Sequence, residues 1–181
     1  MKEMSKNPES FYDLLSLIVS TEDKNYMLTT ICDELRDYIV VDRCSLYLLD
    51  ESTNELYTRV AQGIDYKEIR VSVGYSSLVG YSVLKDKALM IKDVYSDKEL
   101  QKIDKHLTFN SEFDQLGQYK TKNILCLPVK YQNRTIGAFQ MVNKVGGFVQ
   151  SDLSAMEEFS PIIALAVNNA LMTEKLKALT A

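Results

Sequence analysis

Residues 120–152, KTKNILCLPVKYQNRTIGAFQMVNKVGGFVQSD, decide the fold of this 181-residue chain. They contain two runs rich in Ile, Leu and Val, which are separated only by Gln132 and Asn133. Two apolar runs joined by a two-residue polar link are typical of an antiparallel hairpin. A Gly-Gly bend and Phe148 follow, and a long apolar helix pattern begins just after Asp152. The stretch therefore predicts strand, tight turn, strand, loop and helix, in that order.

Composition excludes several classes of function. The formal net charge is −4 and the basic residues are scattered, so no Lys/Arg stripe predicts contact with a nucleic acid. No apolar run reaches membrane-spanning length and no signal peptide is present, so we expect a cytoplasmic protein with no membrane partner. The length predicts a single domain over residues 1–181. Cys32, Cys44 and Cys126 are far apart, which argues against a disulfide framework and a zinc site.

Two helix patterns open the chain. Asn7 and Pro8 are typical of an N-cap and the first helical position, so residues 1–20 predict a first helix. Thr21 is expected to cap a second helix, because its hydroxyl can accept from the free amides of the first turn. Apolar residues at helical spacing predict one buried stripe on this second helix. The stripe consists of Met27, Ile31, Leu35 and Tyr38.

A third long helix pattern closes the chain over residues 153–179. Ser151 or Ser154 is expected to cap it. Pro161 lies inside the pattern and is expected to kink the helix, because proline lacks an amide hydrogen and crowds the preceding turn. No capping residue ends the pattern, which predicts that the helix continues toward another module.

The middle of the chain predicts strands and a lid. Further strands are expected at residues 43–49, 56–61, 69–73 and 88–91, with a short helix before the last of them. Residues 93–118 are polar and charge-dense, and a connection of this length is typical of a lid. One amphipathic helix is expected within it, around Leu100, Ile103 and Leu107.

Strands in the middle and helices at both ends predict an α+β fold with a mostly antiparallel central sheet. The terminal helices are expected on one sheet face, with the short helix and the lid on the other.

This order of elements resembles a GAF domain, a small-molecule sensor and dimerisation fold. It is most similar to the GAF domains that regulate cyclic nucleotide phosphodiesterases and some bacterial adenylyl cyclases. The similarity extends over residues 21–171, which form the expected GAF core. It is carried by DRCSLYLLD (42–50), EIRVSVG (68–74), TKNILCLPVK (121–130) and IGAFQMVNK (136–144).

The resemblance also implies a structural motif. The family signature contains Asn-Lys, Phe and Asp-Glu, and its Lys and Asp pair with each other. The matching residues here are Asn143, Lys144, Phe148 and Asp152. Lys144 and Asp152 are therefore expected to form a brace.

By the same resemblance, the chain is expected to be a non-catalytic sensory domain of an intracellular signalling protein. It would bind a small molecule beneath the lid, with cAMP or cGMP as the first candidate and no other cofactor. Ser45 would face the base, and the amides of Leu78 and Val79 would meet the phosphate at the start of the short helix. The other implied ligand contacts are Gln62, Asp114, Thr121 and Gln140. The signal would pass through a homodimer of the terminal helices.

Two alternatives stay open. In the first, side chains such as Met141 and Tyr119 fill the pocket, and the domain is a ligand-free dimerisation and interaction module. The second is a methionine sulfoxide reductase, because some proteins of this fold reduce free methionine sulfoxide with cysteines near the middle loops. The chain has no cysteine in residues 61–124. Nucleophile-elbow and P-loop patterns are also absent, so an enzyme is not expected.

Overall fold

The computed structural model describes residues 8–63, 68–116 and 118–180. The helices in these ranges are α1 (Pro8–Ser20), α2 (Lys24–Ile39), α3 (Leu78–Leu84), α4 (Asp97–Ile103), α5 (Glu112–Leu116) and α6 (Gln150–Thr180). The strands are β1 (Val41–Asp50), β2 (Glu55–Ala61), β3 (Arg70–Ser72), β4 (Leu89–Ile91), β5 (Ile124–Tyr131) and β6 (Arg134–Lys144). Asn7, the expected cap of the first helix, lies outside the described residues.

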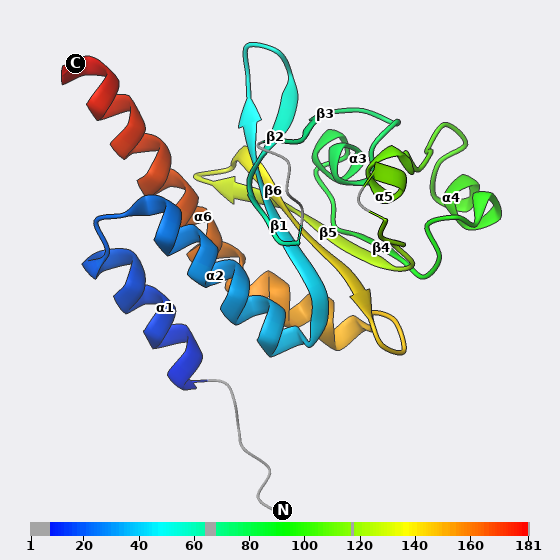
Figure 1. Cartoon of the computed structure of the whole chain (residues 1–181), viewed down its shortest axis with the longest axis horizontal. Helices are drawn as coiled ribbons and strands as arrows, with labels where there is room; N and C mark the ends of the chain where they lie inside the picture. Colours follow the sequence, from blue (N-terminus) through cyan, green and yellow to red (C-terminus); the bar gives the residue numbers. More distant parts are fainter. Residues whose placement is uncertain (1–7, 64–67, 117, 181) are drawn as a thin grey trace, which may run out of the picture.

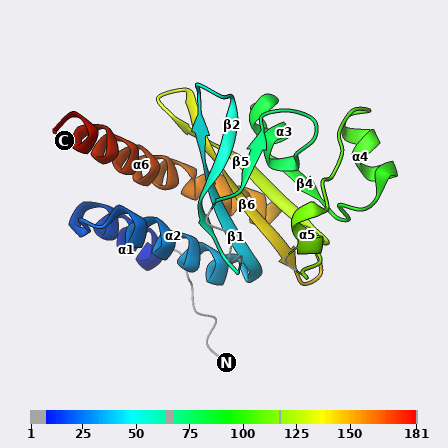
Figure 2. The same cartoon turned by 45° about the horizontal axis from the view of Figure 1, so that its top comes forward.

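The strands form one antiparallel sheet in the order β3-β2-β1-β6-β5-β4. α2 and α6 cover one face, and α1 packs on these two helices (Figure 1). α3, α4 and α5 lie on the other face, as the turned view in Figure 2 also shows. The α+β class and the division of helices between the two faces are confirmed.

The β5–β6 hairpin turns at the two residues that the sequence indicates. Gln132 and Asn133 have φ angles of 48° and 63°. Two consecutive residues with positive φ make a turn whose twist matches that of antiparallel strands. This hairpin places β6 beside β1, in the centre of the sheet.

Asp23, and not Thr21, caps α2. Its carboxylate accepts from the amides of Asn25 (2.9 Å) and Tyr26 (3.1 Å). The Thr21 amide donates to the carbonyl of Leu17 (3.1 Å), so this residue still closes the last turn of α1. The expected cap was therefore wrong by two residues, because Thr21 is still hydrogen-bonded to the end of α1.

The expected caps of the last helix are also wrong. α6 begins at Gln150, so Ser151 and Ser154 lie inside it. The carboxylate of Asp152, the third residue of the helix, reaches back and accepts from the amide of Val149 (2.9 Å), the residue just before the helix. Pro161 lies within α6, which continues beyond it to Thr180.

The larger apolar cluster lies between the sheet and α1, α2 and α6. Phe139 of β6 is its largest fully buried side chain. Of the stripe expected on α2, only Tyr38 is not fully buried, and its ring packs edge-on against Phe159 at 5.2 Å. This sealed layer leaves the opposite sheet face for the lid.

The lid contains two helices where the sequence predicts one. α4 ends at Ile103 because Asp104 adopts an extended conformation (φ −156°, ψ 133°). Leu107 is buried but lies beyond the helix, whereas Ile103 is 39% exposed. A second apolar cluster lies between the lid and the sheet. The lid contributes to it both from a helix, with Leu100, and from irregular chain, with Leu107.

Candidate ligand-binding site

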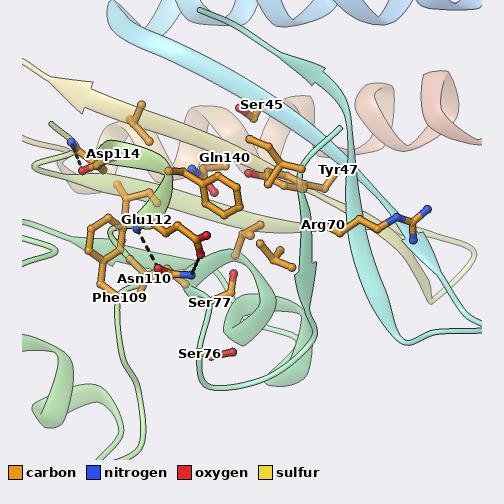
Figure 3. A pocket seen from close by; sticks show the side chains of 18 of the residues that line it. Ser45, Tyr47, Arg70, Ser76, Ser77, Phe109, Asn110, Glu112, Asp114 and Gln140 are labelled. Atoms are coloured by element: carbon orange, nitrogen blue, oxygen red, sulfur yellow. Dashed lines mark hydrogen bonds between the residues drawn. The ribbon is translucent and has the colours of Figure 1, made fainter. Parts of the chain in front are cut away.

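A cavity of about 440 Å³ lies between the sheet and the lid. Its floor comes from β1, β5 and β6, and one side comes from β3. Its roof consists of the start of α3, residues 108–114 of the lid, and Tyr119. Figure 3 shows side chains from these elements pointing toward a common space.

Cross-strand pairs of residues on β1 and β6 form the floor. On β1, Arg43 pairs with Val142 of β6, and two residues later Ser45 pairs with Gln140. Because alternate residues of a strand point to the same face, these side chains all lie on the lid side. Figure 3 shows Ser45, Tyr47 and Gln140 on this side of the cavity.

The roof begins where the chain enters α3. The Ser77 hydroxyl caps this short helix by accepting from the Gly80 amide (3.2 Å). Leu78 and Val79 form the first turn and line the cavity. The first amides of a helix have no partner within the helix, so these two are available donors.

The cavity brings together all seven side chains and backbone positions that were expected to contact a ligand. They are Ser45, Gln62, Leu78, Val79, Asp114, Thr121 and Gln140. Their binding roles stay predictions, and their present hydrogen bonds differ in a way that bears on those roles.

Gln62 is already engaged by the protein. Its side-chain oxygen accepts from the Cys44 amide (2.8 Å), and its side-chain nitrogen donates to Asp33 of α2 (2.7 Å). The residue therefore fastens the end of β2 to β1 and to the helix layer. Gln62 is therefore part of the cavity wall, and both polar atoms of its side-chain amide already have a protein partner.

Asp114 and Thr121 are likewise bound to each other. The buried Asp114 carboxylate accepts from the Thr121 amide and hydroxyl, both at 2.7 Å, and from the Tyr95 hydroxyl at 2.8 Å. Burial and this hydrogen bond raise the pKa of Tyr95 to about 12. These contacts tie the two ends of the lid together, so Asp114 positions the lid above the cavity.

Ser45 and Gln140 are two polar groups of the floor that the protein itself does not engage. Neither side chain forms a hydrogen bond with another residue in the described part of the chain. Both therefore offer a donor and an acceptor to a molecule in the cavity.

Arg43 and Glu112 also line the cavity, although neither was expected to contact a ligand. Arg43 could have been found by strand alternation, since it lies two residues before Ser45. Glu112 carries no such signal because its place depends on the irregular path of the lid. Figure 3 shows the Glu112 carboxylate pointing inward and hydrogen-bonded to Asn110.

Tyr119 forms part of the wall without filling the cavity. Its hydroxyl donates to Asp42 (3.2 Å) and accepts from the Asn143 side chain (2.8 Å). Burial and the nearby Asp42 raise its pKa to about 12. Met141 was expected to fill the pocket in the ligand-free alternative, and this is wrong. It is buried in the cluster on the helix side, because its neighbours Gln140 and Val142 face the lid.

The signature residues join β6 to α6. Lys144 forms an ion pair with Asp152, whose other oxygen accepts from the Val149 amide. Phe148 lies between them in the sequence and is buried in the larger apolar cluster. Asn143 has a φ of 61°, and its side chain accepts from the Lys122 amide and donates to the Lys120 carbonyl. These contacts hold the sheet end against the lid and the last helix.

Reactive and metal-binding groups do not gather at the cavity. All three cysteines are buried, burial raises the pKa of each thiol, and none lines the cavity. Within the described ranges, no group of three or more His, Cys, Asp or Glu side chains could hold a metal ion. None of the helices described combines the length and apolar character needed to cross a membrane.

Sequence comparisons identify relatives of this chain. Residues 26–167 match the family model of the GAF domain. The chain is 27% identical over 180 residues to a probable 3′,5′-cyclic phosphodiesterase, pde-5, of Caenorhabditis elegans. It is 28% identical over 144 residues to the dual 3′,5′-cyclic-AMP and -GMP phosphodiesterase 11A of Takifugu rubripes. These alignments cover 92% and 71% of the chain but only 22% and 15% of the two relatives.

Solved structures share the fold. The GAF domain of a phosphoenolpyruvate-protein phosphotransferase from Coxiella burnetii has a TM-score of 0.74 and 14% identity, with 92% of this chain and 95% of that chain covered. A free methionine-R-sulfoxide reductase from Neisseria meningitidis, solved with its substrate, has a TM-score of 0.71 and 16% identity, with coverages of 91% and 90%.

Proposed function

The chain belongs to the GAF domain family, and we propose that it is a non-catalytic regulatory domain that binds a small molecule between its sheet and its lid. The observation that carries this proposal is the 440 Å³ cavity with the unengaged side chains of Ser45 and Gln140 on its floor. The proposed ligand class is a purine cyclic nucleotide, because the two relatives are named as cyclic nucleotide phosphodiesterases.

A reductase function has less support, although one structural neighbour is a methionine sulfoxide reductase. Such chemistry needs an accessible thiolate. Cys126 lies on the lid side of the sheet, because it pairs with Gln140 and belongs to the apolar cluster beneath the lid. Its side chain is fully buried and its pKa is raised by that burial, so it is neither accessible nor ionised.

Two contacts offer a route from the cavity to the helices. Gln62 lines the cavity and donates to Asp33 on α2. Arg59 of β2 forms an ion pair with Glu174 of α6. A ligand that moves β2 would change both contacts, and only a ligand with different affinities for the two arrangements can shift their populations. We therefore propose that ligand binding is transmitted to α2 and α6 through these two contacts.

Ligand binding is tested by thermal denaturation with cAMP and with cGMP. A ligand at 100 times its dissociation constant is expected to stabilise the native state by about 2.7 kcal/mol. Replacing Gln140 by Leu should remove most of this shift, since it deletes a floor donor and acceptor. Gln101→Leu is the matched control, because Gln101 is exposed on α4 and outside the cavity.

The opposite result is equally clear. If neither nucleotide raises the unfolding temperature, and native mass spectrometry of the purified domain finds no bound small molecule, the domain is not a sensor. A ligand-free interaction module would then be the better description.

We also propose that α1 and α6 form a homodimer contact. The C-terminal half of α6 extends beyond the sheet (Figure 1) and carries an exposed apolar stripe. Its members are Met172, Leu176 and Leu179, and Leu176 is 63% exposed. A long apolar helix face without cover is typical of an interface.

Sedimentation velocity over a hundredfold concentration range tests the dimer. The wild-type chain is expected to dimerise, and Leu176→Glu is expected to weaken dimerisation at least tenfold by placing a charge in an apolar contact. Lys177→Glu, an adjacent exposed position, is the control for added negative charge. A wild-type monomer at every concentration would remove this part of the proposal.

A further inference from the structure

Arg43 differs from every other arginine in the described part of the chain. Each of the others forms an ion pair with at least one carboxylate, and they are Arg36, Arg59, Arg70 and Arg134. Among the described residues, Arg43 has no such partner, although it is half-buried and lines the cavity. A partly buried cation without an anion lacks the compensation that such groups usually find.

The Arg43 guanidinium is held in place by its surroundings. Its central carbon lies 3.7 Å from the centroid of the Tyr119 ring, which is a close cation–π contact. The Tyr119 ring is itself fixed through its hydroxyl, which contacts Asp42 and Asn143. On another side lies Gly63, where an added Cβ would come within 2.7 Å of Arg43 Nε. The absence of a side chain at Gly63 therefore leaves the room that the guanidinium occupies.

This packing covers a face of the guanidinium, and no side chain of the described residues accepts a hydrogen bond from the N–H groups at its edge. An arginine edge matches two oxygens of a phosphate or a carboxylate, and it binds them with paired, charge-assisted hydrogen bonds. The other cavity-lining arginine, Arg70, cannot serve in this way because it already contacts Asp50, Glu55 and Glu68. Figure 3 also shows the Arg70 side chain directed away from the cavity.

We propose that Arg43 binds the anionic group of the ligand, and that this group is the cyclic phosphate of a nucleotide. The inference rests on the proposed function, since it assigns the anionic group of the proposed ligand to one end of the same cavity. It places the phosphate at the end of the cavity where Arg43 of β1 packs on Tyr119. The family resemblance alone would place it in the roof, at the amides of Leu78 and Val79. Ser45 and Gln140, the next cross-strand pair of the floor, are then left for the uncharged part of the ligand.

Isothermal titration calorimetry of the full chain tests this assignment. The titrants are cAMP, cGMP and the uncharged nucleosides adenosine and guanosine. Wild-type protein is expected to prefer a cyclic nucleotide over its nucleoside. Arg43→Gln should weaken nucleotide binding by about 10- to 100-fold, the usual effect of losing charged hydrogen bonds, and leave nucleoside binding unchanged. The nucleotide affinity of Arg43→Lys should lie between those of the wild type and Arg43→Gln, because lysine keeps the charge and loses the paired hydrogen-bond geometry.

Arg134→Gln is the matched control, because Arg134 is exposed at the β5–β6 turn, pairs with Glu51 and does not line the cavity. If the wild type binds a nucleotide and Arg43→Lys and Arg43→Gln bind it equally well, Arg43 does not hold the phosphate, and the proposed function stands. If the two variants lose as much affinity for the nucleosides as for the cyclic nucleotides, Arg43 shapes the cavity and the assignment is wrong. If the wild type binds none of the four compounds, the proposed function and this assignment fail together.

Discussion

Replacing Gly80 by Ala is expected to destabilise the protein by about 3 kcal/mol, the upper part of the usual range for overpacking. Gly80 lies in α3, where an added Cβ would be 2.1 Å from the carbonyl oxygen of Ser72. That oxygen belongs to the backbone of β3 and cannot rotate away. Alanine favours helix over glycine by about 1 kcal/mol, which is too little to offset the clash. We expect the unfolding temperature to fall by roughly 6 to 12 °C.

The matched control for this prediction is Gly74→Ala. A Cβ on Gly74 would meet no heavy atom within 4 Å, and its φ lies outside the left-handed region. The change should alter stability by less than about 0.5 kcal/mol, as for most surface positions. Differential scanning calorimetry of both variants gives the comparison. Equal unfolding temperatures would mean that α3 and β3 do not approach each other this closely.

Gly80 also bears on binding. Ser72 and the first turn of α3 line the cavity from adjacent sides, and the absence of a side chain at Gly80 sets their separation. An alanine there has to push α3 away from β3. The floor would stay in place while the roof moved, so Gly80→Ala should weaken ligand binding in addition to lowering stability.

Much of the sheet could be predicted because its information is local. Gln132 and Asn133 are a two-residue link between apolar runs, and a link of this length specifies a narrow choice of turn. Ser45 and Gln140 came instead from the family resemblance, because β1 and β6 lie far apart in the sequence and no short turn fixes their pairing. Within β6, strand alternation places Met141 on the face opposite Gln140, so the expectation that it fills the pocket contradicted a pattern already present in the sequence.

Helix ends were harder to predict because several neighbouring residues can cap. Thr21 and Asp23 both carry an oxygen suited to a first turn, and the choice depends on where α1 ends. Ser151 and Asp152 present the same ambiguity. Asp152 caps because it also meets Lys144, which lies eight residues earlier and on a different element.

The lid and the charges of the cavity could not be predicted from spacing. Asp114 meets Thr121 and Tyr95 only because the irregular chain between them folds back. The position of Arg43 follows from alternation, but its lack of a carboxylate partner is a property of the assembled structure. Such features depend on contacts between distant segments, which a periodic pattern does not contain.

Replacing Asp114 by Ala is expected to release the lid from the sheet. The change leaves three donors without their acceptor, namely the Thr121 amide and hydroxyl and the Tyr95 hydroxyl. Losing a buried, charged acceptor costs about 3 kcal/mol, which should appear mainly as local opening because the lid is one part of the structure. Hydrogen exchange at the Thr121 amide should then become about 100-fold faster, while exchange within β6 changes little.

Asp97→Ala tests whether this effect is specific, because Asp97 is an exposed lid carboxylate in the first turn of α4. It should leave exchange at Thr121 unchanged. Tyr95→Phe removes only one of the three donors, so its effect should be smaller than that of Asp114→Ala. Ligand affinity should follow the same order, since a lid that is open for more of the time reduces the population able to bind. Exchange at Thr121 that is equally slow in Asp114→Ala and wild type would show that other contacts hold the roof over the cavity.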